Sequence, residues 1–420
     1  MTKSTRKFSK LILGTTIRAV AILLVLVGFG ASATFAQTRA YVANRNDNTV
    51  SVIDIATNTV IATLQIEGVG AIAVTPDGAF AYLTTPNNTV SVLDTATNTI
   101  VATVPVPLGS SMIAITPNGA FAYVTNLGIA VGAVSVIDTA TNTVIATVTV
   151  GRRPEGIAIT PDGAFAYVAN SLSNTVSVID TATNTVSATI PGFILPRWLA
   201  VTPNGAFAYV TNADGSTVAV IDTATNTVTT TIQVGSEPRR IDITPDGAFA
   251  YVAVDSFDNR VVVISTASNT VIARVSVPTP GDIAITPDGA FAYVTNSFSN
   301  TVSVIDTTSN TVTSSILVGD GPIAIAIGTR IQTDPIGSLT AQVQTLIAEG
   351  SLTPDQGAGL IDKLQQVQSK IDNGQTAAAC NQVGSFINQV NAFLNSGSLT
   401  TSQGQALINA ANAIKTSLGC

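Results

Sequence analysis

None of the 420 residues of this chain is a histidine, which limits the catalytic and metal-binding chemistry open to it. A Ser/His/Asp triad, a Cys/His pair, a histidine-ligated metal and a CxxCH haem site are therefore excluded. Groups that remain for binding or catalysis include arginines, aspartates, one tryptophan and two cysteines. A unit of about 42 residues recurs along the chain. Comparing the copies separates residues that recur in each of them from residues that occur in one copy only.

Arginines gather in the short segments where the recurring unit is interrupted. GRRPEG, ILPRW and GSEPRR each contain one or two of them. Guanidinium groups bind carboxylate and phosphate in a planar, bidentate way, so these segments predict a site for an anionic ligand. A competing role is pairing with Glu155, Glu237 and Asp282, and the tryptophan either packs or stacks on a sugar or aromatic ligand. The candidate ligand-binding residues are Arg45, Arg152, Arg153, Arg197, Trp198, Arg239, Arg240 and Arg260.

Two groups of aspartates could be considered for a site. Six aspartates stand in a recurring turn, DTATNT or a close variant, where the carboxylate can accept hydrogen bonds from turn amides. Each is isolated in its own repeat, so no calcium site is expected. Asp242 and Asp282 depart from the repeat and are the candidates for paired carboxylates in a histidine-free enzyme. The turn aspartates are Asp54, Asp94, Asp138, Asp180, Asp222 and Asp306.

The recurring unit consists of four short strands. In the fourth copy they are GIAIT, FAYVAN, TVSVID and TVSATI, each apolar or alternating and bounded by turn residues. TPDG or TPNG closes the first hairpin, and DTATNT closes the last. Four strands in about 42 residues are typical of one propeller blade. The tyrosine that marks each copy falls at Tyr41, Tyr82, Tyr123, Tyr167, Tyr209, Tyr251 and Tyr293.

Seven copies predict an all-β, seven-bladed β-propeller over residues 37–330. The first copy lacks its first strand, and residues 323–327 form an extra strand at the other end of the repeats. We expect this strand to complete the first blade and close the ring. The two uniform turns lie at one end of the strands. The variable connections lie at the opposite end, and those leading into the innermost strands should place their arginines around the central channel.

The repeats resemble a known family. AYVTN and AYVAN, with TPDG before them and VSVIDTATNTV after them, resemble the YVTN-type β-propeller repeats of exported and surface-layer-like proteins of bacteria and archaea. The resemblance implies a cell-surface or extracytoplasmic role, and it fixes no ligand.

A separate helical domain follows. From Pro335 the composition shifts to Gln, Ala, Leu and Asn, with apolar residues at helical spacing. GSLTPDQGAGLI and GSLTTSQGQALI each predict a capped helix start. We expect a linker at 331–337 and a small all-α, four-helix domain at 338–420, which resembles the FIMAH domain of bacterial extracellular proteins. An antiparallel hairpin would bring Cys380 and Cys420 together, which predicts a disulfide.

Residues 1–36 have the pattern of a secretory signal peptide. Basic residues precede an apolar run from Ala19 to Ala31, and the small-residue stretch SATFA follows. The run is short for a membrane span, and an uncleaved anchor is the alternative. Cleavage removes five of the 18 basic and none of the 25 acidic residues, which leaves 13 against 25 and a net charge of −12. Such an acidic protein is not expected to bind nucleic acid.

These features predict an exported, non-catalytic β-propeller that binds a protein, a glycan or another anionic small ligand through its variable face. The expected location is extracellular, cell-surface or periplasmic, with no membrane span after cleavage. No cofactor and no metal site are expected. Two alternatives stay open: a histidine-free enzyme, lactonase-like or cofactor-dependent, that uses the central channel, and a purely structural protein that assembles at the cell surface.

Overall fold

The computed structural model describes residues 34–420 except for 108, 129–130, 255–258 and 334. The chain divides into two compact units, of which one spans Phe35–Gln332 and the other includes Thr333–Cys420. The signal peptide expected at residues 1–36 lies outside the described residues except for its last three, which belong to the first strand.

The described part of the first unit forms seven four-stranded sheets that share one plan. The first strands are β4 (Ile72–Val74), β8 (Ser110–Ile115), β12 (Pro154–Ile159), β16 (Pro196–Val201), β20 (Pro238–Ile243), β24 (Pro280–Ile285) and β28 (Pro322–Thr333). The second strands are β5 (Phe80–Thr85), β9 (Phe121–Asn126), β13 (Phe165–Asn170), β17 (Phe207–Asn212), β21 (Phe249–Val254), β25 (Phe291–Asn296) and β1 (Thr34–Asn44). The third strands are β6 (Thr89–Asp94), β10 (Gly132–Asp138), β14 (Thr175–Asp180), β18 (Thr217–Asp222), β22 (Arg260–Ser265), β26 (Thr301–Asp306) and β2 (Thr49–Asp54). The fourth strands are β7 (Thr99–Pro105), β11 (Thr143–Val150), β15 (Thr185–Pro191), β19 (Thr227–Gln233), β23 (Thr270–Ser276), β27 (Thr311–Leu317) and β3 (Thr59–Gln65).

The first strands lie at the centre of the ring. Successive first strands contact one another, β4 with β8, β8 with β12, β12 with β16, β16 with β20, and β20 with β24. The fourth strands, whose residues are exposed at alternate positions, lie at the rim. This arrangement confirms the predicted seven-bladed β-propeller.

Tyrosine side chains join each blade to the next. Tyr167, in the middle of β13, is buried, and its hydroxyl donates to Asn226 Oδ1 at 2.8 Å in the last turn of the following blade. Asn226 has a φ of 54°, a left-handed conformation that asparagine tolerates better than most residues. The same bond joins Tyr82 to Asn142 at 2.7 Å. The turn that recurs along the sequence therefore holds neighbouring blades together.

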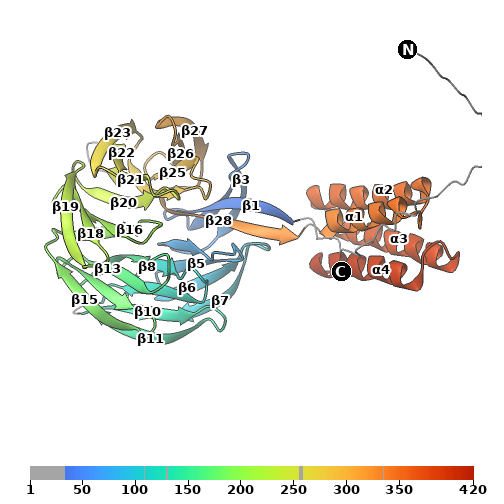
Figure 1. Cartoon of the computed structure of the whole chain (residues 1–420), viewed down its shortest axis with the longest axis horizontal. Coiled ribbons are helices and arrows are strands. Elements are labelled where there is room, and N and C mark those ends of the chain that lie inside the picture. Colours follow the sequence, from blue (N-terminus) through green and yellow to red (C-terminus); the bar gives the residue numbers. More distant parts are fainter. Residues whose placement is uncertain (1–33, 108, 129–130, 255–258, 334) are drawn as a thin grey trace, which may run out of the picture. The chain divides into compact units, whose positions relative to one another are not determined.

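β28 closes the ring. It lies beside β1 in the sheet that also contains β2 and β3, so the two ends of the propeller sequence meet in one blade (Figure 1). The predicted closing strand, residues 323–327, lies within β28. The predicted linker at 331–337 is corrected, because β28 runs to Thr333 and the first helix begins at Pro335. β28 has 12 residues, and β1, beside which it lies in the sheet, has 11.

Each rim strand carries the same irregularity. Val178 faces Ala188 and Ile179 faces Val186, so Ser187 of β15 has no partner and forms a bulge. The same shift separates the third and fourth strands of the other six described sheets. Bulges hinder a sheet edge from pairing with another sheet, which counts against assembly through paired rim strands.

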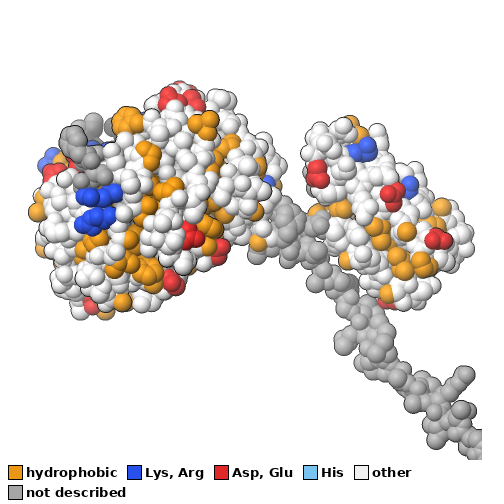
Figure 2. Space-filling view, turned by 90° about the horizontal axis from the view of Figure 1, so that it is seen from above, with side chains coloured by type: hydrophobic (Ala, Val, Ile, Leu, Met, Phe, Trp, Pro, Cys, Tyr) orange, Lys and Arg blue, Asp and Glu red, His pale blue; other side chains and the backbone are white. Residues whose placement is uncertain are grey.

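The connections fall at two opposite ends of the strands, because neighbouring strands are antiparallel. Turns from first to second and from third to fourth strands share one end. Connections from second to third strands, and from one blade to the next, share the other end, which we call the variable face. The propeller contains no lysine. The basic side chains that gather on one part of its largely uncharged surface in Figure 2 are therefore arginines.

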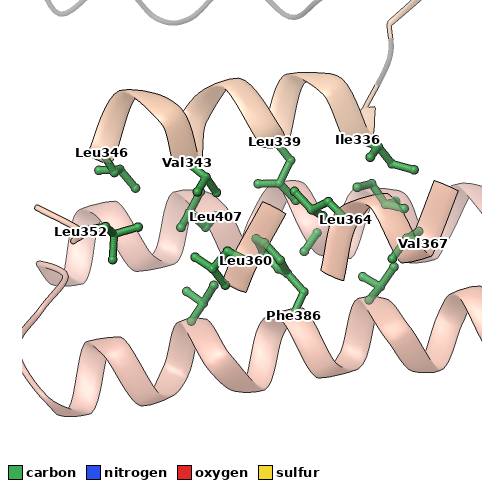
Figure 3. Close-up of a cluster of buried hydrophobic side chains, with 14 of the residues drawn as sticks. Ile336, Leu339, Val343, Leu346, Leu352, Leu360, Leu364, Val367, Phe386 and Leu407 are labelled. Atoms are coloured by element: carbon green, nitrogen blue, oxygen red, sulfur yellow. The ribbon is translucent and has the colours of Figure 1, made fainter. Parts of the chain in front are cut away.

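The second unit is helical. Its described residues form α1 (Pro335–Ala348), α2 (Pro354–Asp372), α3 (Thr376–Asn395) and α4 (Thr401–Ser417). Val343, Leu360, Phe386 and Leu407, one from each helix, belong to a single buried core (Figure 3). The predicted four-helix domain is confirmed. Among the described residues, no helix is long and apolar enough to cross a membrane.

Local sequence fixes two helix starts and one covalent link in this unit. Thr353 and Thr400 are N-caps, and Gln356 and Gln403 complete a capping box with them, as predicted. Cys380 in α3 and Cys420 after α4 form the predicted disulfide, with 6.2 Å between their Cα atoms.

Candidate functional site

A cavity of about 330 Å³ opens at the variable face where the first strands converge. Its wall includes Arg45, Glu155, Trp198 and Arg240. Arg45 lies in the connection between β1 and β2, and the other three lie on β12, β16 and β20. The ring therefore brings together three predicted ligand-binding residues that are far apart in the sequence.

Five side chains form a continuous ladder across the first strands of four successive blades. At one end, Arg197 Nε lies 3.7 Å from Glu155 Oε2. The guanidinium carbons of Arg197 and Arg240 lie 5.7 and 5.5 Å from the centre of the Trp198 ring. At the other end, Arg240 Nε lies 3.6 Å from Asp282 Oδ1. Ion pairs and cation–π contacts together restrict the rotamers of these side chains around the cavity.

Glu155 anchors one end of this ladder. It is buried, accepts a hydrogen bond from Ser171 Oγ at 3.0 Å, and pairs with Arg153 Nε at 3.0 Å. The pairing role that the sequence left open for the arginines thus holds for Arg153, Arg197 and Arg240. These three guanidinium groups are positioned by carboxylates of the protein itself.

The other predicted arginines differ in their positions. Arg45 is exposed on the cavity wall, where its backbone N–H donates to Gly321 O at 3.0 Å. Arg152 is exposed in the connection that precedes β12. Arg239 precedes Arg240 in β20, and Arg260 begins β22, the third strand of its blade. These last three residues are not part of the described cavity wall.

Asp242 and Asp282 bridge the first strands of adjacent blades. Asp242 Oδ1 accepts the N–H of Ile243 and Oδ2 accepts the N–H of Ile285 in the next blade, both at 2.9 Å. Asp282 bonds two successive first strands in the same way, at 2.9 and 3.0 Å. Each first strand is paired along one edge only. The carboxylates therefore satisfy N–H groups on the unpaired, channel-facing edge.

Burial raises the pKa of both carboxyl groups. For Asp242, burial and the nearby charge of Asp282 outweigh two backbone hydrogen bonds and raise the pKa to about 6. For Asp282, burial again dominates, and the guanidinium of Arg240 and two backbone N–H groups oppose it. Of the two carboxylates that the sequence singled out for an enzyme, Asp282 thus contributes to the raised pKa of Asp242.

Replacing Asp242 by alanine is expected to flatten the pH dependence of stability. Its folded pKa of about 6 lies above the ordinary 3.8. The contribution of the Asp242 carboxyl to the free energy of unfolding is therefore fully present below about pH 4. It is lost as the pH rises through about 6. A shift of about two units corresponds to roughly 3 kcal/mol. Urea unfolding at about pH 4 and pH 7.5 should show a smaller difference for Asp242→Ala than for the parent, by up to that amount.

Alanine is a tolerable replacement at this position, because the equivalent residues of the other six blades are alanines. Parallel plots of unfolding free energy against pH for parent and variant would contradict the prediction. The equivalent residues are Ala73, Ala114, Ala158, Ala200, Ala284 and Ala326.

Sequence reasoning missed one side of the cavity. Ser110, Ser111 and Met112, at the start of β8, line it together with Gly70. The usable signal was the departure of SSMIAI from the corresponding PEGIAI and PRRIDI segments. These small and flexible side chains were missed because only charged and aromatic residues were considered as candidates.

Two family models match parts of the chain. Residues 110–214 match the YNCE-like beta-propeller, and residues 336–416 match the FIMAH domain. The expected resemblance to a β-propeller repeat protein with a C-terminal FIMAH domain is confirmed for these segments. No curated protein matches the sequence.

Solved structures share the propeller fold. Hydrazine synthase from Kuenenia stuttgartiensis is 25% identical, over 62% of this chain and 89% of that chain, with a TM-score of 0.56. A protein of unknown function from Desulfotomaculum acetoxidans is 20% identical, over 69% and 98%, with a TM-score of 0.62. The periplasmic gluconolactonase of Pseudomonas aeruginosa is 18% identical, over 71% and 100%, with a TM-score of 0.60. Likeness at this level supports the fold and assigns no activity to this chain.

Proposed function

We propose that this protein is an exported, non-catalytic binding protein whose propeller takes an anionic ligand, or an acidic group of a larger partner, at the channel mouth. The observation that carries the proposal is the convergence of repeat-breaking residues on one cavity. Arg45, Glu155, Trp198 and Arg240 come from four blades that are otherwise near copies, and they meet in its wall. Residues that only maintain the fold recur in each repeat, so binding best explains this cluster.

The charges around the cavity favour an anion. The charged residues of its described wall are two arginines, Arg45 and Arg240, and one carboxylate, Glu155. Glu155 is already paired with Arg153 and Arg197, and Arg240 with Asp282. Arg45 is exposed, so its guanidinium is accessible to a ligand at little cost in folding energy. The indole of Trp198 adds an apolar surface, and a few polar groups in a partly apolar wall are typical of small-ligand sites.

Export is supported by two features. A disulfide such as Cys380–Cys420 persists in oxidising compartments and is rare in the reducing cytosol. The N-terminal pattern of basic, apolar and small residues is that of a secretory signal.

Replacing Arg45 by alanine is expected to weaken binding of the ligand about tenfold or more, because a charge-assisted hydrogen bond contributes about 1.5–3 kcal/mol. The measurement is a screen of the full mature chain against uronic acids, sialic acids, small carboxylic acids and their neutral counterparts, followed by calorimetric titration of the hits. The melting temperature should stay unchanged, because the Arg45 side chain is exposed.

Arg274→Ala is the matched control for that variant. Arg274 is also an exposed arginine, but it lies on the rim strand β23, away from the cavity. Equal losses of affinity in both variants would show that the effect comes from net charge and not from the cavity. A screen in which no anionic compound binds would overturn the proposal.

The neighbouring carboxylates of Asp242 and Asp282 favour a second candidate, a histidine-free hydrolase that uses the channel carboxylates. Asp242 is partly accessible and, with a pKa of about 6, could exchange a proton near neutral pH. Against this candidate, both oxygens of each carboxylate already accept backbone hydrogen bonds. Turnover of a lactone by the parent that disappears in Asp242→Ala would establish it, and turnover equal in the two proteins would exclude this pair.

A further inference from the structure

The channel-facing edge of each first strand offers backbone donors in two tiers. The N–H groups of Ala71, Met112 and Asp282 point the other way, toward the second strand, where each bonds a threonine hydroxyl at 2.8–2.9 Å. Since successive residues of a strand present their backbone groups to opposite edges, the N–H of the next residue faces the channel. The tier nearer the variable face, called here the upper tier, comprises the N–H groups of Ile72, Ile113, Ile157, Leu199, Ile241, Ile283 and Ile325.

The protein itself shows how this tier binds a carboxylate. Asp282 Oδ1 accepts the N–H of Ile283 at 2.9 Å, and Oδ2 accepts the N–H of Ile325 at 3.0 Å. The two donors belong to adjacent blades. A single carboxylate therefore bridges one pair of upper-tier N–H groups, and Arg240 pairs with the same carboxylate at 3.6 Å.

An equivalent pair of donors lies beside the cavity without such a carboxylate. Ala71, immediately before β4, is the equivalent of Asp282 in its own blade, because the N–H groups of both residues donate to a threonine hydroxyl of the second strand. The pair that Ala71 leaves open comprises the N–H groups of Ile72 and Ile113. Neither group donates to another atom in the described part of the chain. Gly70 and Met112, which line the cavity, lie two residues before Ile72 and one residue before Ile113.

We propose that the cavity binds a small carboxylic acid whose carboxylate bridges the N–H groups of Ile72 and Ile113, in the way that the Asp282 carboxylate bridges its own two donors. The inference rests on the proposed function, because it names the chemical group that the channel mouth recognises. Arg45 and Arg240 on the same wall attract the acid electrostatically. The cavity of about 330 Å³ is at the small end of ligand sites, which fits a single acidic sugar or hydroxy acid.

Backbone resonances test the contact directly. The full mature chain, labelled with ¹⁵N-isoleucine, is titrated with D-glucuronate and with methyl glucoside as the neutral counterpart. Single Ile→Val replacements identify the four relevant peaks. The amides of Ile72 and Ile113 should shift with glucuronate and stay in place with the glucoside. The amides of Ile283 and Ile325 serve as internal controls and should not move, because Asp282 already occupies them.

Two variants, one immediately before β4 and one within it, test whether a carboxylate of the protein can fill the site. Ala71→Asp places a carboxylate at the position of Asp282 and should weaken glucuronate binding at least tenfold. Ala73→Asp, two residues further along the chain, corresponds to Asp242, whose carboxylate accepts the N–H groups of Ile243 and Ile285, two residues beyond the upper tier. This variant should bind glucuronate like the parent. Circular dichroism tests whether both variants fold. If Ala71→Asp does not fold, the amide shifts of the parent protein alone test the proposed contact.

The outcomes separate the two proposals. Glucuronate binding that depends on Arg45 but leaves the Ile72 and Ile113 amides unmoved would overturn the bridging carboxylate and keep the proposed function. Equal shifts at all four amides would also overturn it. If neither glucuronate nor any other acid binds, both proposals fall.

Discussion

A chain that ends at Gly321 is expected not to form a folded propeller, whereas a chain that ends at Thr333 should fold. The two differ only in β28, the strand that pairs with β1. Its loss removes Ala324 and Ile325 from two buried clusters and exposes the inner edge of β1. Losing a buried isoleucine alone costs about 2–5 kcal/mol, and an unpaired, apolar strand edge adds to that cost. The total approaches the 5–15 kcal/mol by which most proteins are stable.

Thermal unfolding followed by β-sheet circular dichroism measures this effect. Both chains lack the helical unit, so the comparison isolates the closing strand. The chain ending at Thr333 should melt cooperatively, and the chain ending at Gly321 should show no cooperative transition or a greatly lowered one. Midpoints within a few degrees of each other would show that closure contributes little.

Replacing Cys380 and Cys420 by serine is expected to lower the stability of the helical unit by about 4 kcal/mol. The disulfide spans 40 residues of sequence, and the chain-entropy model gives about that value for a loop of this length. For a unit of this size the loss corresponds to a fall of roughly 15–30 °C in melting temperature. Helical circular dichroism of the full chain during heating measures it, and the parent in a reducing agent should behave like the double variant.

Thr400→Ala is the reference variant against which the loss of stability in the cysteine variant is compared. Removing this N-cap should cost about 1 kcal/mol, far less than removing the disulfide. A double cysteine variant that melts together with the Thr400 variant would show that the bond closes a loop that is already ordered in the unfolded chain.

The sequence by itself determined the frame of this protein. The alternating strand FAYVAN, the TPDG and DTATNT turns and the period of about 42 residues act locally, so each can be read from a short window. The capping boxes at Thr353 and Thr400 are local in the same way. The disulfide was predictable because two cysteines allow one pairing within the chain.

The tertiary structure decided which irregular residues meet. Arg45 and Arg240 are nearly 200 residues apart, and only closure of the ring brings both to one cavity wall. The sequence grouped Arg152, Arg239 and Arg260 with them, because it indicates which connections lead to the channel mouth but not which side chains there reach one cavity wall. The channel-facing N–H groups could not be predicted from residue types, since every residue except proline carries a backbone N–H. Their exposure depends on each first strand being paired along one edge, which is a property of the ring as a whole.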